Sequence, residues 1–134
     1  MLILVENDRR LQSIVDVPAL AWDLMDFSEK PLTIIYDEPK GVAKNLIAED
    51  NSIGIRMVEP MFLKQLIGKL NSPLVSTSAN VSGEASPSSL LETVSEEIKN
   101  SVDYILDIKV DSIINKSSSI IKLSKDSQVK VIRE

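Results

Sequence analysis

The sequence predicts an α/β or α+β domain, in which helices flank a twisted, mixed sheet. Short apolar or alternating segments, which are typical of strands, alternate with helical patterns along most of the chain. The last part of the chain has the pattern of a β-hairpin, which would add antiparallel strands to the sheet. Because 134 residues suit one domain of ordinary size and no linker or repeat interrupts them, residues 1–134 are interpreted as a single domain.

The first half of the chain contains three predicted strands. They are expected at residues 2–5, 31–36 and 53–58, with a helix at residues 19–25 and one or two helical turns at residues 42–47. Asp16 is expected to cap the helix, and Pro18 suits its first turn. Side chains of the third strand alternate in character, so its two faces should differ. One face would carry Ile53, Ile55 and Met57, and the other Gly54, Arg56 and Val58.

The second half contains two predicted helices. Pro60 opens the first, which continues through Leu70. Its apolar stripe would be formed by Leu63, Leu66, Ile67 and Leu70. The second begins at Ser89, which forms a capping box with Glu92, and ends near Lys99. The remaining segments are strands at residues 73–76, 104–106, 119–123 and 128–132, a polar loop at residues 77–87 and a hairpin turn at residues 124–127.

Composition excludes several kinds of chemistry. The chain has no cysteine and no histidine, which removes disulfides, thiolate nucleophiles, zinc sites of the Cys/His type and imidazole catalysis. A net charge of −5 and a pI of about 4.8 disfavour non-specific nucleic-acid binding, which needs an excess of Lys and Arg. The sequence has no apolar run long enough for a membrane helix and no signal-peptide pattern, so we expect a cytoplasmic protein with no membrane partner.

The polar loop and the strand before it concentrate groups that can bind a ligand. Residues 76–80 read Ser-Thr-Ser-Ala-Asn, and a glycine follows at Gly83. Hydroxyls and backbone N–H groups can donate to phosphate oxygens, and glycine permits close approach of a ligand. Ligands of α/β proteins bind where strand ends feed such loops. The same residue types are also ordinary loop formers, and composition alone favours that simpler interpretation.

Together with their neighbours, these residues resemble the YrdC/TsaC family. The resemblance is carried by residues 30–33 (Lys-Pro-Leu-Thr), 53–56 (Ile-Gly-Ile-Arg), 73–83 (Pro-Leu-Val-Ser-Thr-Ser-Ala-Asn-Val-Ser-Gly), 103–107, 117–123 and 131–133. Their order and spacing agree with the family over nearly the whole chain, and the Ser-Thr-Ser-Ala-Asn core is specific. The implied fold is YrdC-like, a twisted and largely open mixed sheet with flanking helices around a concave basic cleft.

The resemblance also implies a reaction. Members of the family join L-threonine, bicarbonate and ATP into threonylcarbamoyl-AMP with release of pyrophosphate, which supplies the threonylcarbamoyl group (t6A) of a tRNA adenosine. ATP and Mg²⁺ would act as a substrate complex, and no tightly bound cofactor or protein-held metal is expected. Proteins of this superfamily are also described as binding double-stranded RNA, which the acidic composition makes the minor expectation here.

Roles for individual residues follow from the same resemblance. It assigns threonine contacts to Arg56, Ser76 and Ser118, and nucleotide contacts to Ser52, Ser78, Asn80, Ser86 and Arg133. A guanidinium fork suits the carboxylate of threonine. Simpler interpretations remain open: Arg56 as a solvent-facing strand residue, Asn80 as a brace of its own loop, and Arg133 as a surface residue. No residue is assigned as a catalytic group or metal ligand.

Two motifs of the family are not found among these residues, namely a Pro-Thr-Asp/Glu-Thr strand and a Lys-x-Arg pair. Residues 1–5 resemble the strand that follows the Lys-x-Arg region, so the chain is interpreted as an N-terminally truncated domain. Without those two cations, a triphosphate should bind poorly, and weak or no synthase activity is expected of this chain alone. An exposed sheet edge would favour a homodimer. The alternatives are a non-catalytic module that binds nucleotide or double-stranded RNA, and a domain whose polar loop is only structural.

Overall fold

The computed structural model describes residues 1–81, 93–106 and 118–133. The chain divides into two compact units, one comprising Met1–Ser76 with Ser118–Glu134 and the other Thr77–Ser117. The prediction of a single domain over residues 1–134 stays a prediction beside this division. Within the described ranges, every helix is too short or too polar to span a lipid bilayer.

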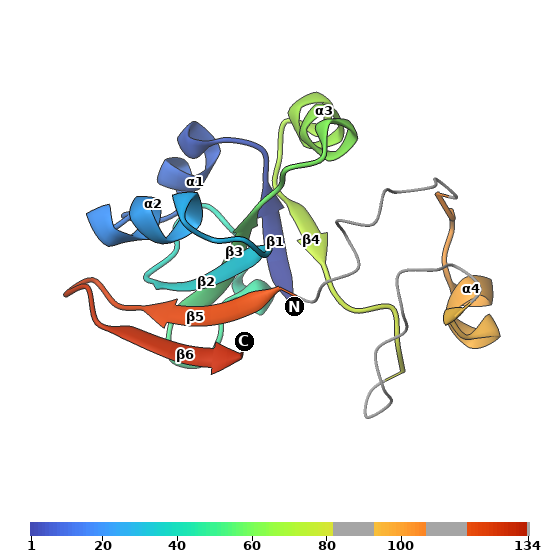
Figure 1. Ribbon diagram of the computed structural model, residues 1–134. Helices are drawn as coiled ribbons and strands as arrows, with labels where there is room; N and C mark the ends of the chain where they lie inside the picture. Colours follow the sequence, from blue (N-terminus) through green and yellow to red (C-terminus); the bar gives the residue numbers. More distant parts are fainter. Residues whose placement is uncertain (82–92, 107–117, 134) are drawn as a thin grey trace. The chain divides into compact units, whose positions relative to one another are not determined.

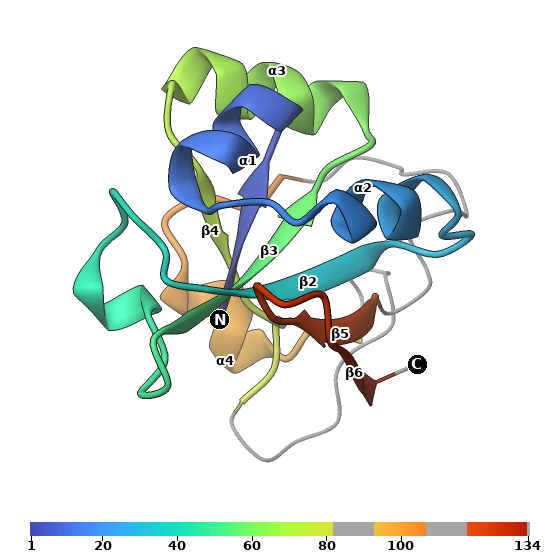
Figure 2. The same ribbon diagram turned by 90° about the vertical axis from the view of Figure 1, so that its left-hand side faces the viewer.

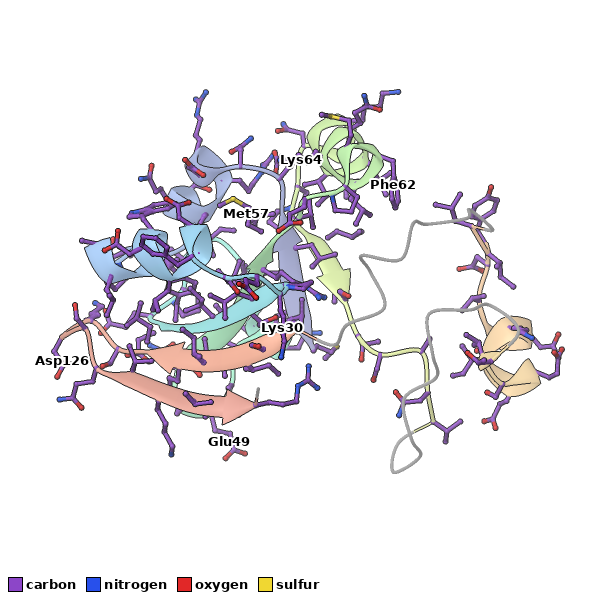
Figure 3. The ribbon with its side chains drawn as sticks, viewed as in Figure 1. Lys30, Glu49, Met57, Phe62, Lys64 and Asp126 are labelled. Carbon is purple, nitrogen blue, oxygen red and sulfur yellow. The ribbon has the colours of Figure 1, made fainter. Side chains whose placement is uncertain are left out.

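The first unit is built on a six-stranded mixed sheet with the strand order β4-β1-β3-β2-β5-β6 (Figure 1). The strands are β1 Leu2–Val5, β2 Leu32–Asp37, β3 Ser52–Met57, β4 Leu74–Ser76, β5 Ser119–Leu123 and β6 Val129–Arg133. Strands β1 and β3 are parallel, as are β2 and β5, while the other three neighbouring pairs are antiparallel. This arrangement confirms the predicted mixed α/β class and the hairpin, whose turn carries Asp126 (Figure 3).

Helices cover the two faces of this sheet unequally. The helical elements of the first unit are α1 Asp8–Ile14, α2 Ala19–Asp26, the single 3₁₀ turn η1 Lys44–Leu46, and α3 Met61–Leu70. Helices α1 and α2 lie on one face, whereas α3 lies on the other side of β1 (Figures 1 and 2). The two apolar clusters show this division, because Ile3 packs with α1 and α2 while the next residue, Leu4, packs with Ile67 of α3.

The larger cluster forms the core between the sheet and helices α1 and α2. Its buried members are Ile3, Val5, Leu11, Ile14, Val15, Ala21, Ile34, Tyr36, Ile53, Ile55, Ile121 and Leu123. Met57 packs against its margin (Figure 3). The core is thus almost entirely aliphatic, as the low aromatic content of 4% requires. Tyr36 is the exception, and burial raises the pKa of its hydroxyl well above the usual value.

Helix α1 was not among the predicted elements. It is short and contributes only two buried side chains, Leu11 and Ile14, so its apolar periodicity is weak. Its start is fixed by Asn7, whose Oδ1 accepts a hydrogen bond from the backbone N–H of Arg10 at 2.8 Å.

One prediction about the other helices of this unit was wrong, and another holds only in part. Asp16 does not cap α2, because the N-cap position is taken by Pro18, which has no side-chain acceptor. The predicted apolar stripe of α3 is only partly buried: Ile67 is fully buried, but Leu66 and Leu70 are 45% and 53% exposed. The helix lies over the narrow end of the sheet at β1 and β4, which is too small to cover the whole stripe.

In the second unit, the described helix is α4, Glu96–Ser101. Its N-cap is Ser95, whose Oγ accepts from the backbone N–H of Ile98, so the helix starts later than predicted. The capping box proposed for Ser89 and Glu92 lies outside the described residues. Residues 104–106 are not a strand as predicted, and their side chains are exposed.

Strand β1 is paired on both sides, with β3 and with β4. The edges of the first unit's sheet are therefore β4 and β6, and every residue of β6 is exposed. A homodimer through an exposed sheet edge stays a prediction, and these two strands are the edges available for it.

We expect Asn7→Ala to lower the free energy of unfolding by about 1 kcal/mol, because it removes the side-chain acceptor at the start of α1. Denaturant-induced unfolding would measure the change. The matched control is Asn7→Asp, which keeps an acceptor and should remain close to the wild type. Equal stability of Asn7→Ala and the wild type would contradict the cap.

Candidate functional site

Away from α3, the sheet face opposite α1 and α2 carries several polar side chains. Along β3, Ile53 and Ile55 point into the core beneath the two helices. Strand alternation therefore turns Ser52, Gly54 and Arg56 to the opposite face, as predicted from the sequence. Val58 follows the same alternation and packs in the cluster beneath α3, which closes this end of the face.

Neighbouring strands extend this surface across the sheet. Continuing the β2–β3 register by one residue places Thr33 beside Arg56, and the β2–β5 register pairs Thr33 with Ile120. Ile120 is paired in turn with Arg133 of β6. We define the polar face as the side chains of Thr33, Ser52, Arg56, Ser118, Lys122 and Arg133.

A β-bulge in β6 brings Arg133 to the polar face. Ile121 pairs with Val131, but Ile120 pairs with Arg133, so Ile132 is an extra residue on β6. An extra residue shifts the alternation of side chains by one position. Without the bulge, Arg133 would point to the face covered by α1 and α2.

Arg133 is anchored by Ser118, the residue that immediately precedes β5. Its Nε and Nη2 atoms donate to the Ser118 carbonyl oxygen at 3.2 and 2.8 Å. Nη2 also lies 3.4 Å from the Ser118 hydroxyl oxygen. That hydroxyl oxygen accepts a further hydrogen bond from Thr33 Oγ1 at 3.1 Å. These contacts hold the Arg133 guanidinium over the polar face.

Arg56 is half-buried and forms no hydrogen bond or ion pair with a described residue. Burial lowers the pKa of its guanidinium below the usual value, and the positive charge of Arg133 lowers that pKa further. Arg133 likewise has no acidic partner among the described residues. A half-buried cation without a carboxylate partner, such as Arg56, is costly, and a bound anion would relieve that cost.

The other end of the polar face carries carboxylates instead. Lys122 Nζ lies 2.7 Å from Asp50 Oδ2 and 3.5 Å from Asp37 Oδ1. The buried Ser52 donates its hydroxyl to Asp50 Oδ1 at 2.5 Å. Hydrogen bonds from Lys122 and then Ser52 lower the pKa of Asp50. Because two carboxylates neutralise Lys122, an anionic ligand is favoured only at the end with Arg56 and Arg133.

The structure brings four of the predicted site residues onto the polar face, namely Ser52, Arg56, Ser118 and Arg133. Ser76 lies on β4 opposite Leu2, at the margin of the same side of the sheet. Within the described part of the first unit, no cluster of acidic residues is placed to hold a metal ion. The binding roles of these residues stay predictions, but their placement makes a common site possible.

The remaining predicted site residues are not among the described residues of the first unit. Ser78 and Asn80 lie in the second unit, where Asn80 Nδ2 donates to the carbonyl oxygen of Val81 at 3.1 Å. Ser86 lies outside the described residues. Thr33 belongs to the site but was not predicted as a site residue; its only signal was its place in the Lys-Pro-Leu-Thr segment.

Comparison with known proteins places this chain in a family. The family model for Sua5/YciO/YrdC proteins, described as telomere recombination, matches residues 1–134. One similar protein comes from Methanocaldococcus jannaschii and is provisionally named threonylcarbamoyl-AMP synthase. It is 33% identical to this chain over 130 residues, or 96% of this chain. A threonylcarbamoyl-AMP synthase from Idiomarina loihiensis is 32% identical over 111 residues, or 79% of this chain. The chain spans 59% of the length of each of these two relatives.

The fold is also similar to a solved structure. A double variant of Sua5 from P. abyssi superimposes with a TM-score of 0.75 and 25% sequence identity. The match covers 92% of this chain and 36% of that protein. The sheet and helices described above are therefore an arrangement that recurs in a larger protein of the family.

We expect Arg56→Met to raise the free energy of unfolding of the ligand-free chain by about 1 kcal/mol, because it removes a half-buried charge that has no acidic partner among the described residues. Since a guanidinium stays charged far above neutral pH, the gain should not change across neutral pH. Thermal or chemical unfolding would measure it.

The matched control is Arg9→Met on the exposed surface of α1, which should change stability by less than about 0.5 kcal/mol. A loss of stability in Arg56→Met would show that Arg56 is already compensated in the free protein.

Proposed function

This chain belongs to the Sua5/YciO/YrdC family, and we propose that it carries a substrate-binding sheet of a threonylcarbamoyl-AMP synthase. In the proposed reaction, L-threonine, bicarbonate and ATP give threonylcarbamoyl-AMP and pyrophosphate, and the product serves the t6A modification of tRNA. Mg²⁺ enters with ATP as part of the substrate complex. The names of the two curated relatives support this assignment.

The observation that carries the proposal is the arginine pair on the polar face. Arg56 and Arg133 lie on the same face of the sheet, the charge of Arg133 contributes to the lowered pKa of Arg56, and no described carboxylate neutralises either. Each of the three proposed substrates offers an anionic group: threonine its carboxylate, ATP its phosphates, and bicarbonate is itself an anion. Guanidinium groups bind carboxylates and phosphates in a bidentate manner and are therefore suited to all three.

Separate roles for the residues follow from their surroundings. Arg56 has a guanidinium free of described partners and would bind the threonine carboxylate, with the Ser118 hydroxyl as a second donor. Arg133 is fixed by the Ser118 carbonyl and would face the phosphates, where it would stabilise developing negative charge. Ser52, at the acidic end, would meet an uncharged part of the nucleotide. Contacts of Ser76, Ser78, Asn80 and Ser86 with the substrates are proposed from the family resemblance alone.

Weak or no turnover is proposed for these residues by themselves. The chain spans 59% of each curated relative, and the family's Lys-x-Arg pair and Pro-Thr-Asp/Glu-Thr strand are not among the 134 residues. A triphosphate carries several negative charges, and each charged hydrogen bond it lacks costs about 1.5–3 kcal/mol of binding. The alternative function is a nucleotide-binding module of the same fold, which would bind ATP·Mg²⁺ without any gain from L-threonine or bicarbonate.

In a calorimetric titration with ATP·Mg²⁺, we expect binding that L-threonine and bicarbonate strengthen. Arg56→Ala should weaken threonine binding about tenfold or more, because a charge-assisted hydrogen bond is lost. Arg9→Ala, which removes an exposed arginine of α1, is the matched control and should bind as the wild type does. Equal binding by Arg56→Ala and the wild type would refute the role given to the arginine pair.

A turnover assay would test the second part of the proposal. The 134-residue chain should release little pyrophosphate from ATP in the presence of L-threonine and bicarbonate, because the family's additional cations are not present to neutralise the triphosphate. A full-length relative provides the positive control. Pyrophosphate release at the rate of that control would show that the site is complete without those cations.

A further inference from the structure

We propose that Thr33 is a positioning residue of this site, which fixes the Ser118 hydroxyl as a hydrogen-bond donor to an anionic oxygen of the substrate. The inference rests on the proposed function, because it concerns the site in which threonine binds. It goes further by assigning a task to a residue that touches no ligand itself, and by stating which kind of substrate atom Ser118 meets.

The Thr33–Ser118 contact is buried and joins two distant parts of the chain. Thr33 is 2% exposed and Ser118 is 5% exposed. Thr33 Oγ1 donates to Ser118 Oγ at 3.1 Å. Buried hydroxyls cost free energy unless they are hydrogen-bonded, so this pair is held together in the folded chain.

The Thr33 side chain is oriented from both of its neighbouring strands. A Cβ atom built on Gly54 of β3 would lie 3.5 Å from Thr33 Cγ2, so the methyl group faces β3. The hydroxyl is directed to Ser118, at the start of β5 on the other side of β2. A β-branched side chain has few χ1 rotamers, and contact on both sides leaves Thr33 with one arrangement.

Counting hydrogen bonds at Ser118 shows the consequence. Its hydroxyl oxygen accepts from Thr33 Oγ1 and lies 3.4 Å from Arg133 Nη2, which can only donate. A serine hydroxyl has two acceptor positions and one proton. Both acceptor positions are therefore directed within the protein, and the proton is left for a ligand.

A hydroxyl that is free only to donate a hydrogen bond favours ligand atoms that accept one. A carboxylate oxygen accepts such a hydrogen bond. An amide NH₂ group in the same position is itself a donor, so its hydrogen atoms would face the Ser118 proton and no hydrogen bond would form. Arg56 and Arg133 on the same face add positive charge and favour the same choice. Thr33 thus contributes to selection of a carboxylate, through Ser118, without contacting it.

The test is a comparison of L-threonine with L-threoninamide, both titrated into the full chain in the presence of ATP·Mg²⁺. The variants are Thr33→Val, which keeps the branched shape and removes the hydroxyl, and Thr33→Ser, which keeps the hydroxyl. For Thr33→Val we expect L-threonine to bind about fivefold more weakly. The ratio of the Kd for the amide to the Kd for L-threonine should fall about threefold or more, because Ser118 can then accept as well as donate. Thr33→Ser should restore the wild-type ratio.

A residue that only stabilises the fold would change the unfolding midpoint but not this ratio. An unchanged ratio in Thr33→Val, with L-threonine binding intact in the wild type, would overturn the inference and leave the proposed function standing. If the wild type binds no L-threonine at all, the proposed function fails and this inference fails with it. Should Thr33→Val not fold, Thr33→Ala removes the same hydroxyl and gives the same test.

Discussion

Strand β3 lies between β1 and β2, and hydrogen bonds to both neighbours fix the direction of each of its side chains. Ile53 and Ile55 are held in the core beneath α1 and α2, so Arg56 has to point to the opposite face. A slip of one residue would bury the arginine and expose both isoleucines. The apolar core on one face therefore determines the chemistry of the other, and the remaining features of the site are arranged around that fixed position.

The site collects positive charge at a cost to the free protein. Arg56 and Arg133 both lie on the polar face without a described acidic partner, and burial and the charge of Arg133 both lower the pKa of Arg56. Local structure maintains this arrangement: the bulge in β6 turns Arg133 to the polar face, and the Ser118 carbonyl anchors its guanidinium. Proteins commonly tolerate such a loss of stability where the charges serve binding. The carboxylates around Lys122 confine the positive potential to one end of the face.

The sequence was sufficient to predict those parts of the fold that depend on local periodicity. The alternation along β3 and the hairpin at the end of the chain were predicted and are present. Helix α1 was missed, because two buried side chains give too short a periodic signal. The bulge that redirects Arg133 has no local signature in the sequence. The predicted strand ended at residue 132, one residue before Arg133. The contact of Thr33 with Ser118 depends on the pairing of β2 with β5, which no local pattern specifies.

The central claim is that Arg56 and Arg133 together form the anion-binding part of this protein. It is tested most directly by NMR of the arginine Nε–H groups during titration with ATP·Mg²⁺ and L-threonine. We expect the Nε–H resonances of Arg56 and Arg133 to shift together with increasing ligand, while that of Arg9, exposed on α1, does not move. Shifts confined to other arginines, or binding that leaves both resonances unchanged, would contradict it.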